Sequence, residues 1–346
     1  MKTIWSSQHR QHAPAHELID GEVRSHVEIP ERAELVLSAV RDAALGDVVE
    51  LSGAVDRAAI ERVHDPRFVA FLERAWSDWI ADGRTYEALP MVWPTHAMRR
   101  TPGEEPDVID GRLAHWSFDA GTPITSGTWP AALASAGVAL AATRLVLAGE
   151  RHAFALCRPP GHHAAADAYG GYCYLNNSAI AAQALRDAGA ERVAVLDVDY
   201  HVGNGTQTIF YDRPDVLTIS LHADPRQEYP FFLGRVDERG AGAGDGFHRN
   251  LPMPWGTGFD VWSAALDDAC NEIERFAPDA LVVPLGVDTH VSDPISRFTL
   301  ETADYLRVGA RIAALGAPTV VVLEGGYATD VIGVNVANVL RGLADG

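Results

Sequence analysis

Short apolar runs alternate with amphipathic stretches over the second half of the chain. Runs rich in Val, Ile and Leu are followed by Ala- and Leu-rich segments whose apolar residues recur with helical period. This alternation is typical of βαβ units and predicts a parallel sheet. The predicted strands cover residues 153–157, 193–199, 216–222, 280–287 and 318–323. The predicted helices cover residues 176–190, 261–276, 302–315 and 330–343.

The first 150 residues are less regular. Helical periodicity predicts helices near 31–44, 66–81 and 129–148, and a long polar, Pro-containing stretch covers about 83–127. A loop of this length in a compact chain is usually functional or disordered. We see no break in composition and no internal repeat. We therefore expect a single α/β domain over residues 1–346, with a mostly parallel central sheet flanked by helices on both faces.

Composition and charge exclude several classes of protein. With 47% hydrophobic and 22% charged residues, the chain can bury a core and is not a disordered protein. Its formal charge of −19 repels phosphate backbones, so nucleic-acid binding is not expected. No run approaches the ~20 apolar residues of a membrane-spanning helix, and the start of the chain lacks the apolar core of a signal peptide. Three cysteines without a CxxC pair indicate reduced thiols. We expect a cytoplasmic protein with no membrane partner.

A polar cluster directly follows one of the buried strands. The segment VAVLDVDYHVGNGTQ places Asp197, Asp199 and His201 at a spacing of two, which puts all three on one face of an extended chain. Ligands of parallel sheets bind beyond the carboxyl ends of the strands. Burying two carboxylates there without a cation would cost several kcal/mol. The segment therefore predicts a metal site.

The next apolar strand supplies a further ligand. In ALVVPLGVDTHVSDP the strand ends at Asp288. Alone, such an Asp is usually a turn former or a helix cap. Together with Asp199 and His201 it gives two oxygens and one nitrogen and leaves a coordination position open, which is typical of a catalytic zinc site. The same ligands also accept Fe²⁺, Co²⁺ or Mn²⁺.

Two other strand ends carry candidate acid–base groups. The segment CRPPGHHAAADAYGGYCYLNN contains His162, His163, Gly171 and Tyr172, and its glycines indicate backbone close to a ligand. The segment TVVVLEGGYATD contains Tyr327 after two glycines, which permit a sharp turn toward a metal. Each cluster alone could be structural. Their combination with the metal motif favours catalysis.

The segments RPPGHHA, DVDYHVGNGTQ, SLHADP, GVDT and EGGY resemble, in this order, those of the zinc-dependent deacetylases. This family includes histone deacetylases and bacterial acetylpolyamine amidohydrolases, and the similarity to the latter runs through nearly the whole chain. The resemblance implies the arginase-deacetylase α/β fold and hydrolysis of an acyl amide by water activated on zinc.

The resemblance also implies roles for individual residues. The implied zinc ligands are Asp199, His201 and Asp288. His163 is the implied general base, and His162 its electrostatic or proton-donating partner. Asp197 and Asn204 are implied to orient His162 and His163, respectively. Tyr327 is implied to donate a hydrogen bond to the substrate carbonyl.

Further expectations concern the substrate tunnel and a second ion. Tyr172 and Tyr229 match positions whose rings line the family's narrow acyl-chain tunnel, beside Gly171. A potassium ion is implied next to the zinc. Its implied ligands here are Asp197 and Ser220, with the backbone carbonyls of Asp199, His201 and Leu221.

The stretch before residue 127 bears on substrate choice. Acetylpolyamine enzymes bind the distal ammonium of the substrate with a carboxylate, and the position of that carboxylate corresponds to Gly121 here. Asp110 and Asp119 lie close enough in sequence to replace it. The family's long loop helps to form a dimer that narrows the entrance. We therefore expect a homodimer or higher homo-oligomer and a slender small-molecule substrate.

Several functions stay open on this basis. The leading hypothesis is deacetylation of an N-acetylated diamine or polyamine. Another small or xenobiotic amide is favoured if Gly121 removes ammonium recognition, whereas the restrictive loop disfavours acetyl-lysine proteins. A binuclear manganese ureohydrolase would need more carboxylates than the GVDT segment offers. A silent amide binder would have lost a ligand or catalytic group, and none is missing.

Overall fold

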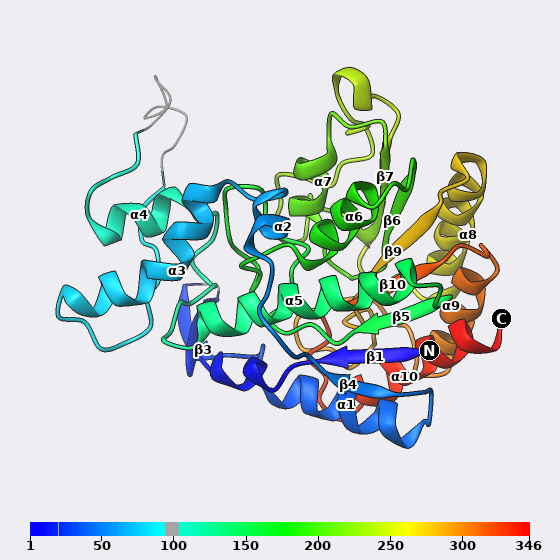
Figure 1. The fold of residues 1–346 in the computed structure, drawn as a ribbon, viewed down its shortest axis with the longest axis horizontal. Helices are drawn as coiled ribbons and strands as arrows, with labels where there is room; N and C mark the ends of the chain where they lie inside the picture. The colour runs from blue at the N-terminus through cyan, green and yellow to red at the C-terminus, as the bar shows by residue number, and fades with distance from the viewer. Residues whose placement is uncertain (20, 94–103) are drawn as a thin grey trace.

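The chain folds around one large parallel sheet (Figure 1). The computed structural model describes residues 1–19, 21–93 and 104–346. Eight strands pair in parallel in the order β4-β1-β5-β10-β9-β6-β7-β8. Their bounds are β1 Lys2–Trp5, β4 Val48–Glu50, β5 His152–Ala155, β6 Val193–Asp197, β7 Val216–Ala223, β8 His248–Met253, β9 Ala280–Leu285 and β10 Thr319–Leu323. A separate antiparallel hairpin is formed by β2 (His16–Ile19) and β3 (Glu22–Ser25).

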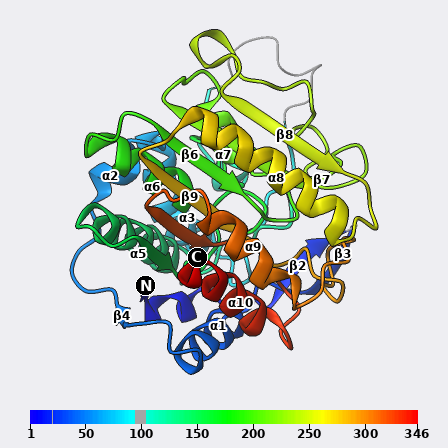
Figure 2. The ribbon, with the colours of Figure 1, turned by 90° about the vertical axis from the view of Figure 1, so that its right-hand side faces the viewer.

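Helices cover both faces of the sheet, as Figure 2 shows. One layer contains α5 (Thr128–Leu147) and α6 (Asn177–Asp187). The other contains α1 (Glu31–Asp42), α8 (Phe259–Phe276), α9 (Asp304–Ala313) and α10 (Ile332–Asp345). The remaining helices are α2 (Arg57–Glu61), α3 (Pro66–Ala81), α4 (Ile109–His115) and α7 (Asn204–Phe210).

Alternate strand residues belong to the two layers. In β6, Val193 and Val195 pack with the α5–α6 layer, whereas Ala194 and Leu196 pack with the α8–α10 layer. This period of two follows from strand geometry. Because both faces are buried, the central strands appear in the sequence as continuous apolar runs. The prediction of a parallel α/β sheet with helices on both faces is confirmed.

The elements that the sequence pattern missed are short or polar. Each of the five predicted strands and seven predicted helices has a counterpart with bounds shifted by a few residues. The edge strand β8 was missed because two of its buried positions are His248 and Asn250, so no apolar run marks it. The terminal strand β1 and the three-residue β4 are too brief to show a period.

The stretch 83–127 is not a continuous loop. It contains α4, and a β-bridge joins Ala88 to Ile124 near its two ends. Arg112 of α4 forms an ion pair with Asp78 of α3 (Nη1–Oδ2, 2.9 Å). Residues 94–103, which include Pro94 and Pro102, lie outside the described residues. The role of this stretch in substrate entry and dimer formation stays a prediction.

One helix, α5, is long and apolar enough to cross a membrane by length and composition. However, 67% of its most apolar window is buried inside the protein, where it packs on β1, β5 and β10. Its apolar character is therefore explained by its contact with the sheet.

The central strands should dominate stability, and a pair of Leu→Ala variants tests this. Leu281 of β9 is fully buried, so Leu281→Ala should lower the free energy of unfolding by about 2–5 kcal/mol. Leu306 of α9 is 44% exposed, and Leu306→Ala should change it by about 0.5 kcal/mol or less. Urea unfolding followed by circular dichroism measures both. Equal shifts in the two variants would contradict the layered core.

Candidate active site

The polar clusters predicted from the sequence meet at one edge of the sheet. The strands β5, β10, β9 and β6 are neighbours in this order. Parallel neighbours have their carboxyl ends at the same edge. Figure 1 shows these ends pointing away from the chain termini, toward the side that carries β3 and α3. The four segments that follow these strands therefore surround a common space.

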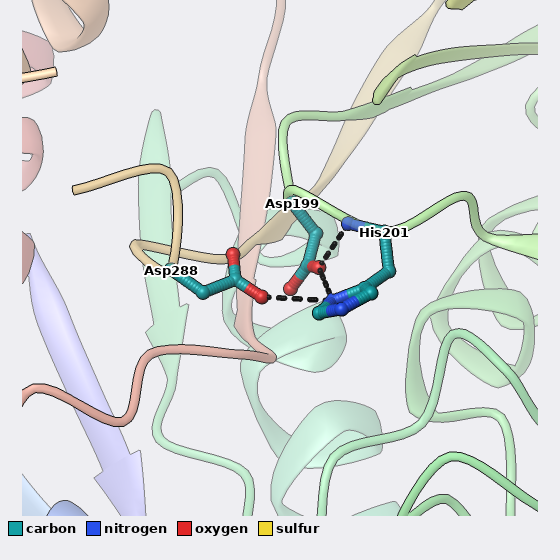
Figure 3. A group of neighbouring side chains, drawn as sticks. All are labelled: Asp199, His201 and Asp288. Carbon is teal, nitrogen blue, oxygen red and sulfur yellow. Dashed lines mark hydrogen bonds and ion pairs between the residues drawn. The ribbon is translucent and has the colours of Figure 1, made fainter. Parts of the chain in front are cut away.

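Asp199, His201 and Asp288 form the centre of this site (Figure 3). Their potential ligand atoms all lie within 4.8 Å of one another, and all three residues are buried. His201 Nδ1 lies 3.4 Å from Asp199 Oδ1 and 3.1 Å from Asp288 Oδ2. Within the described residues this is the one group of three or more such side chains that meets metal-site geometry.

The local backbone explains how the β6 segment presents these groups. The strand ends at Asp197, two residues earlier than predicted, so simple alternation does not continue to His201. Instead, the Asp199 amide donates to Asp197 Oδ1 (3.1 Å), and the His201 amide donates to Asp199 Oδ1 (2.9 Å). These are two successive side-chain turns of the kind that Asp favours. The prediction of a shared face was wrong, but the convergence was correct.

Glycines allow the neighbouring strand ends to approach the carboxylates. A Cβ on Gly286 would clash with the Asp199 carboxylate, and one on Gly325 would clash with those of Asp199 and Asp288. The Gly325 amide donates to Asp199 Oδ2 (2.8 Å). The Tyr200 amide donates to Asp288 Oδ1 (2.9 Å). Backbone amides thus hold both oxygens of Asp199 and one oxygen of Asp288.

The donor set fits a divalent cation. Burial, together with the charge of Asp199, raises the pKa of Asp288 to about 7. Burial would lower the pKa of His201, but its contacts with Asp199 and Asp288 outweigh this and raise it well above its usual value. Both shifts favour the protonated forms of these groups. A cation bound by the same two oxygens and one nitrogen would displace a proton from them.

Two histidines flank the triad and have different partners. His162 Nδ1 lies 2.9 Å from Asp197 Oδ2, and its Nε2 lies 3.8 Å from Asp199 Oδ1. His163 Nδ1 lies 2.6 Å from Asn204 Oδ1, while Asn204 Nδ2 donates to the His163 carbonyl (3.3 Å). With Asn204 as the acceptor, His163 carries its proton on Nδ1 and has a free lone pair on Nε2.

These partners shift the two imidazoles in opposite directions. Burial would lower the pKa of His162, but Asp199 and Asp197 raise it to about 10. Burial and the charges of His162 and His201 lower the pKa of His163 well below its usual value. At neutral pH His162 is a cation and His163 a neutral base. Such a split between neighbouring groups is typical of acid–base sites.

Tyr327 follows the glycine turn after β10. Its amide donates to Asp293 Oδ2 (2.7 Å), and the guanidinium of Arg32 lies 4.6 Å from its ring centroid. The Tyr172 ring meets it edge-on at 5.7 Å. Burial raises the pKa of Tyr327 well above 10 despite the opposing charge of Arg32, so its phenol stays protonated. It can therefore donate a hydrogen bond at neutral pH.

The predicted tunnel residues lie beside the histidines. The Tyr229 ring meets that of His163 edge-on at 5.3 Å. Gly171 has a positive φ of 57°, and a Cβ there would clash with the His163 ring. Asp119 joins the two segments, because its Oδ2 accepts from the Gly171 amide and the Tyr229 hydroxyl, both at 2.6 Å. Its Oδ1 accepts from the amide of Gly121 (3.1 Å).

Asp110 is not brought into this arrangement. Its carboxylate pairs with Arg84 at 2.6 Å, and no described hydrogen bond or ion pair joins it to the site residues. A substrate contact through Asp110 is therefore unsupported, because Arg84 already neutralises its charge.

The residues expected to hold potassium are adjacent in the sheet. Asp197 of β6 and Ser220 of β7 are register partners, and Leu221 follows. The Ser220 hydroxyl lies 2.8 Å from His222 Nδ1. Together they place a carboxylate and a hydroxyl on neighbouring strands, and the ion itself stays a prediction.

Comparison with known proteins identifies the family. The model of the histone deacetylase domain matches residues 26–343. The chain belongs to the histone deacetylase family. It is 54% identical over 342 residues to acetylpolyamine amidohydrolase 2 of Pseudomonas aeruginosa, covering 99% of this chain and 98% of the relative. It is 48% identical over 347 residues to the acetylpolyamine amidohydrolase of Mycoplana ramosa, covering 99% and 100%.

A solved structure of this family agrees in fold. The crystal structure of acetylpolyamine aminohydrolase from Burkholderia pseudomallei matches with a TM-score of 0.92 and 42% identity, covering 99% of this chain and 98% of that chain. The expected arginase-deacetylase fold is thereby confirmed.

Sequence reasoning missed several residues that hold the site of this histone deacetylase family member together. Arg32 donates to the carbonyl of Glu324 (2.7 Å) and to that of Gly326. Asp293 accepts from the amides of Tyr327 and Ala328. Glu324 belongs to the EGGY segment, but the sequence indicated no role for it. Arg32 and Asp293 were missed because their contacts with residues 324–328 join positions 34 or more residues apart in the sequence.

A metal titration tests the triad. The loss of an outer partner already weakens metal binding by roughly 10–100-fold, so Asp288→Asn should weaken Zn²⁺ binding by more than about 100-fold. Binding should also release a proton, because the pKa of His201 is raised, and affinity should therefore fall as the pH is lowered.

Isothermal titration calorimetry in two buffers of different ionisation enthalpy measures both effects. Asp110→Asn is the matched control, because it removes the same charge away from the triad. Unchanged Zn²⁺ affinity in Asp288→Asn would rule out this site.

Proposed function

We propose that this protein is a zinc-dependent amidohydrolase that removes the acetyl group from an acetylated diamine or polyamine. The observation that carries the proposal is the buried Asp199–His201–Asp288 group with a neutral His163 and a protonated Tyr327 beside it. The full-length similarity to proteins named acetylpolyamine amidohydrolases supports the substrate class.

Each catalytic group has a role that its environment supports. Zinc held by the triad lowers the pKa of water and polarises a carbonyl. His163 takes a proton from the attacking water through Nε2 and delivers it to the leaving nitrogen. His162 stays protonated beside it and stabilises developing negative charge. Tyr327 donates to the carbonyl oxygen as that oxygen becomes anionic. Asp197 and Asn204 keep the two imidazoles in these states.

Other features of the proposal rest on the family. We infer a potassium ion held by Asp197, Ser220 and Leu221, where an oxygen-rich environment suits a hard cation. Fe²⁺ or Co²⁺ could replace zinc on the same ligands. A homodimer or higher homo-oligomer and a cytoplasmic location belong to the same proposal.

One specific observation favours a second candidate, an amidase for another small neutral amide. Residue 121 is Gly, so no carboxylate stands where acetylpolyamine enzymes read the distal ammonium. Asp119 can compensate. A carboxylate offers about four acceptor positions, and Asp119 uses three of them within the protein. We therefore infer that Asp119 accepts a hydrogen bond from the substrate cation.

Substitution of Tyr327 tests the mechanism. Tyr327→Phe should lower kcat by about 10²–10³-fold, because it removes a donor used in the transition state. KM should change little, because the ring and its contacts with Arg32 and Tyr172 remain. Steady-state kinetics with acetylputrescine measure both constants. The exposed Tyr86→Phe is the matched control, and a normal kcat in Tyr327→Phe would remove the phenol from the mechanism.

A pair of substrates tests the specificity. The measurement is kcat/KM for acetylputrescine and for an acetamide of equal length with an uncharged tail. The wild-type protein should prefer the cation, and Asp119→Asn should lower kcat/KM for acetylputrescine by roughly tenfold or more while sparing the neutral amide. Asp110→Asn should change neither. A wild-type preference for the neutral amide would move the protein out of the polyamine group, and equal losses in Asp119→Asn would leave that residue a purely structural role.

A further inference from the structure

A buried carboxylate behind the histidine pair has no place in the mechanism above. Glu324 is fully buried, directly after β10. Its Oε2 accepts from the Gly161 amide (2.5 Å) and the His162 amide (3.1 Å), and its Oε1 accepts from the Ser178 hydroxyl (2.8 Å). All three partners lie more than 140 residues away in the sequence. Glu324 therefore fixes the backbone from which the histidines project.

The residues that follow Glu324 reach the other parts of the site. The Gly325 amide donates to the metal-ligand carboxylate of Asp199 (2.8 Å). Two residues further on, Tyr327 supplies the phenol. The segment 324–327 thus contacts the backbone of His162 and the triad residue Asp199, and it ends at Tyr327. A shift of any part of it changes the distance between base and phenol.

Several contacts keep this segment rigid. Arg32 holds two of its carbonyls, and Asp293 holds the Tyr327 amide. Ser178, the hydroxyl partner of Glu324, lies in the first turn of α6, where the helix dipole favours negative charge. Removal of the carboxylate would leave the buried amides of Gly161 and His162 without an acceptor, which costs free energy. Removal of a residue that only fills space would leave no such unpaired donors.

A space-filling role explains this geometry poorly. An apolar side chain could fill this fully buried position without the desolvation free energy that a carboxylate costs. Glu324 accepts hydrogen bonds from the backbone amides of Gly161 and His162. Asn204 holds the ring of His163 through its Nδ1. The carboxylate therefore determines where both imidazoles stand.

We propose that Glu324 is a positioning residue that sets the His162–His163 backbone against Tyr327 and the triad. It acts through the length and acceptor geometry of its side chain. The inference rests on the proposed amide hydrolysis, because the histidines must work as base and electrostatic partner for their placement to matter.

Two substitutions of Glu324 distinguish the effect of side-chain length from that of charge. Glu324→Gln keeps the side-chain length, and its amide oxygen can still accept both backbone N–H groups. Glu324→Asp keeps the charge but is one methylene too short to reach them. Positioning predicts that Gln retains kcat within about threefold of wild type, whereas Asp lowers kcat by about 10–100-fold. KM should stay within about threefold in both variants, because neither touches the tunnel wall.

The assay uses the zinc-loaded full chain with acetylputrescine, and the zinc content and thermal midpoint of each variant are measured alongside. The exposed Glu191→Gln is the matched control and should equal wild type. An Asp variant that is as active as Gln, or more active, would overturn the proposal. So would a loss of zinc from the Asp variant that accounts for its lower kcat.

A milder variant covers the case in which Glu324→Asp does not fold. Ser178→Ala removes one of the three hydrogen bonds and leaves the carboxylate less constrained. It should lower kcat severalfold at unchanged KM, and an unchanged kcat would contradict the proposal. An inactive wild-type protein would instead refute the proposed function, so the two failures are distinguishable.

Discussion

The burial of two carboxylates beside a single imidazole is the constraint on which the site depends. Asp199 and Asp288 are both withdrawn from solvent, and the neighbouring histidines and backbone amides offset their mutual repulsion. Such a pair is costly without a cation. The surroundings are consistent with this demand, because Gly286 and Gly325 leave no side chain between the carboxylates and the adjoining strand ends. The fold therefore brings charge to a point where a metal ion stabilises it.

The two neighbouring histidines have different hydrogen-bond partners. His162 and His163 are neighbours in sequence, and their ring centroids lie 4.1 Å apart. One faces the carboxylate of Asp197 and the other the neutral amide of Asn204. The first therefore keeps a proton, and the resulting charge helps to remove a proton from the second. Two carboxylates, Asp199 and Asp197, raise the pKa of His162, whereas burial and two neighbouring imidazoles lower the pKa of His163.

The sequence predicted the parts of this molecule that leave a local signal. Strands buried on both faces appear as apolar runs, and the ligands Asp199 and His201 follow one of them within four residues. The edge strand β8 escaped because its inward residues are polar. Glu324 and Arg32 escaped for another reason, since the contacts that tie them to the site join residues 146 to 294 positions apart. Nearness in sequence also does not show that the charge of Asp110 pairs with Arg84, and a substrate contact through Asp110 stays a prediction.

Chemistry and specificity are carried by different kinds of structure. The ligands, the histidines and Tyr327 follow strands of the rigid sheet, and buried hydrogen bonds hold them from several sides. The residues predicted to line a substrate tunnel lie in loops instead, with Asp119 hydrogen-bonded to Gly171 and to Tyr229. Loops tolerate change better than strand ends do. A loop residue such as Gly121 can therefore change without moving the ligands, the histidines or Tyr327, which follow strands of the sheet.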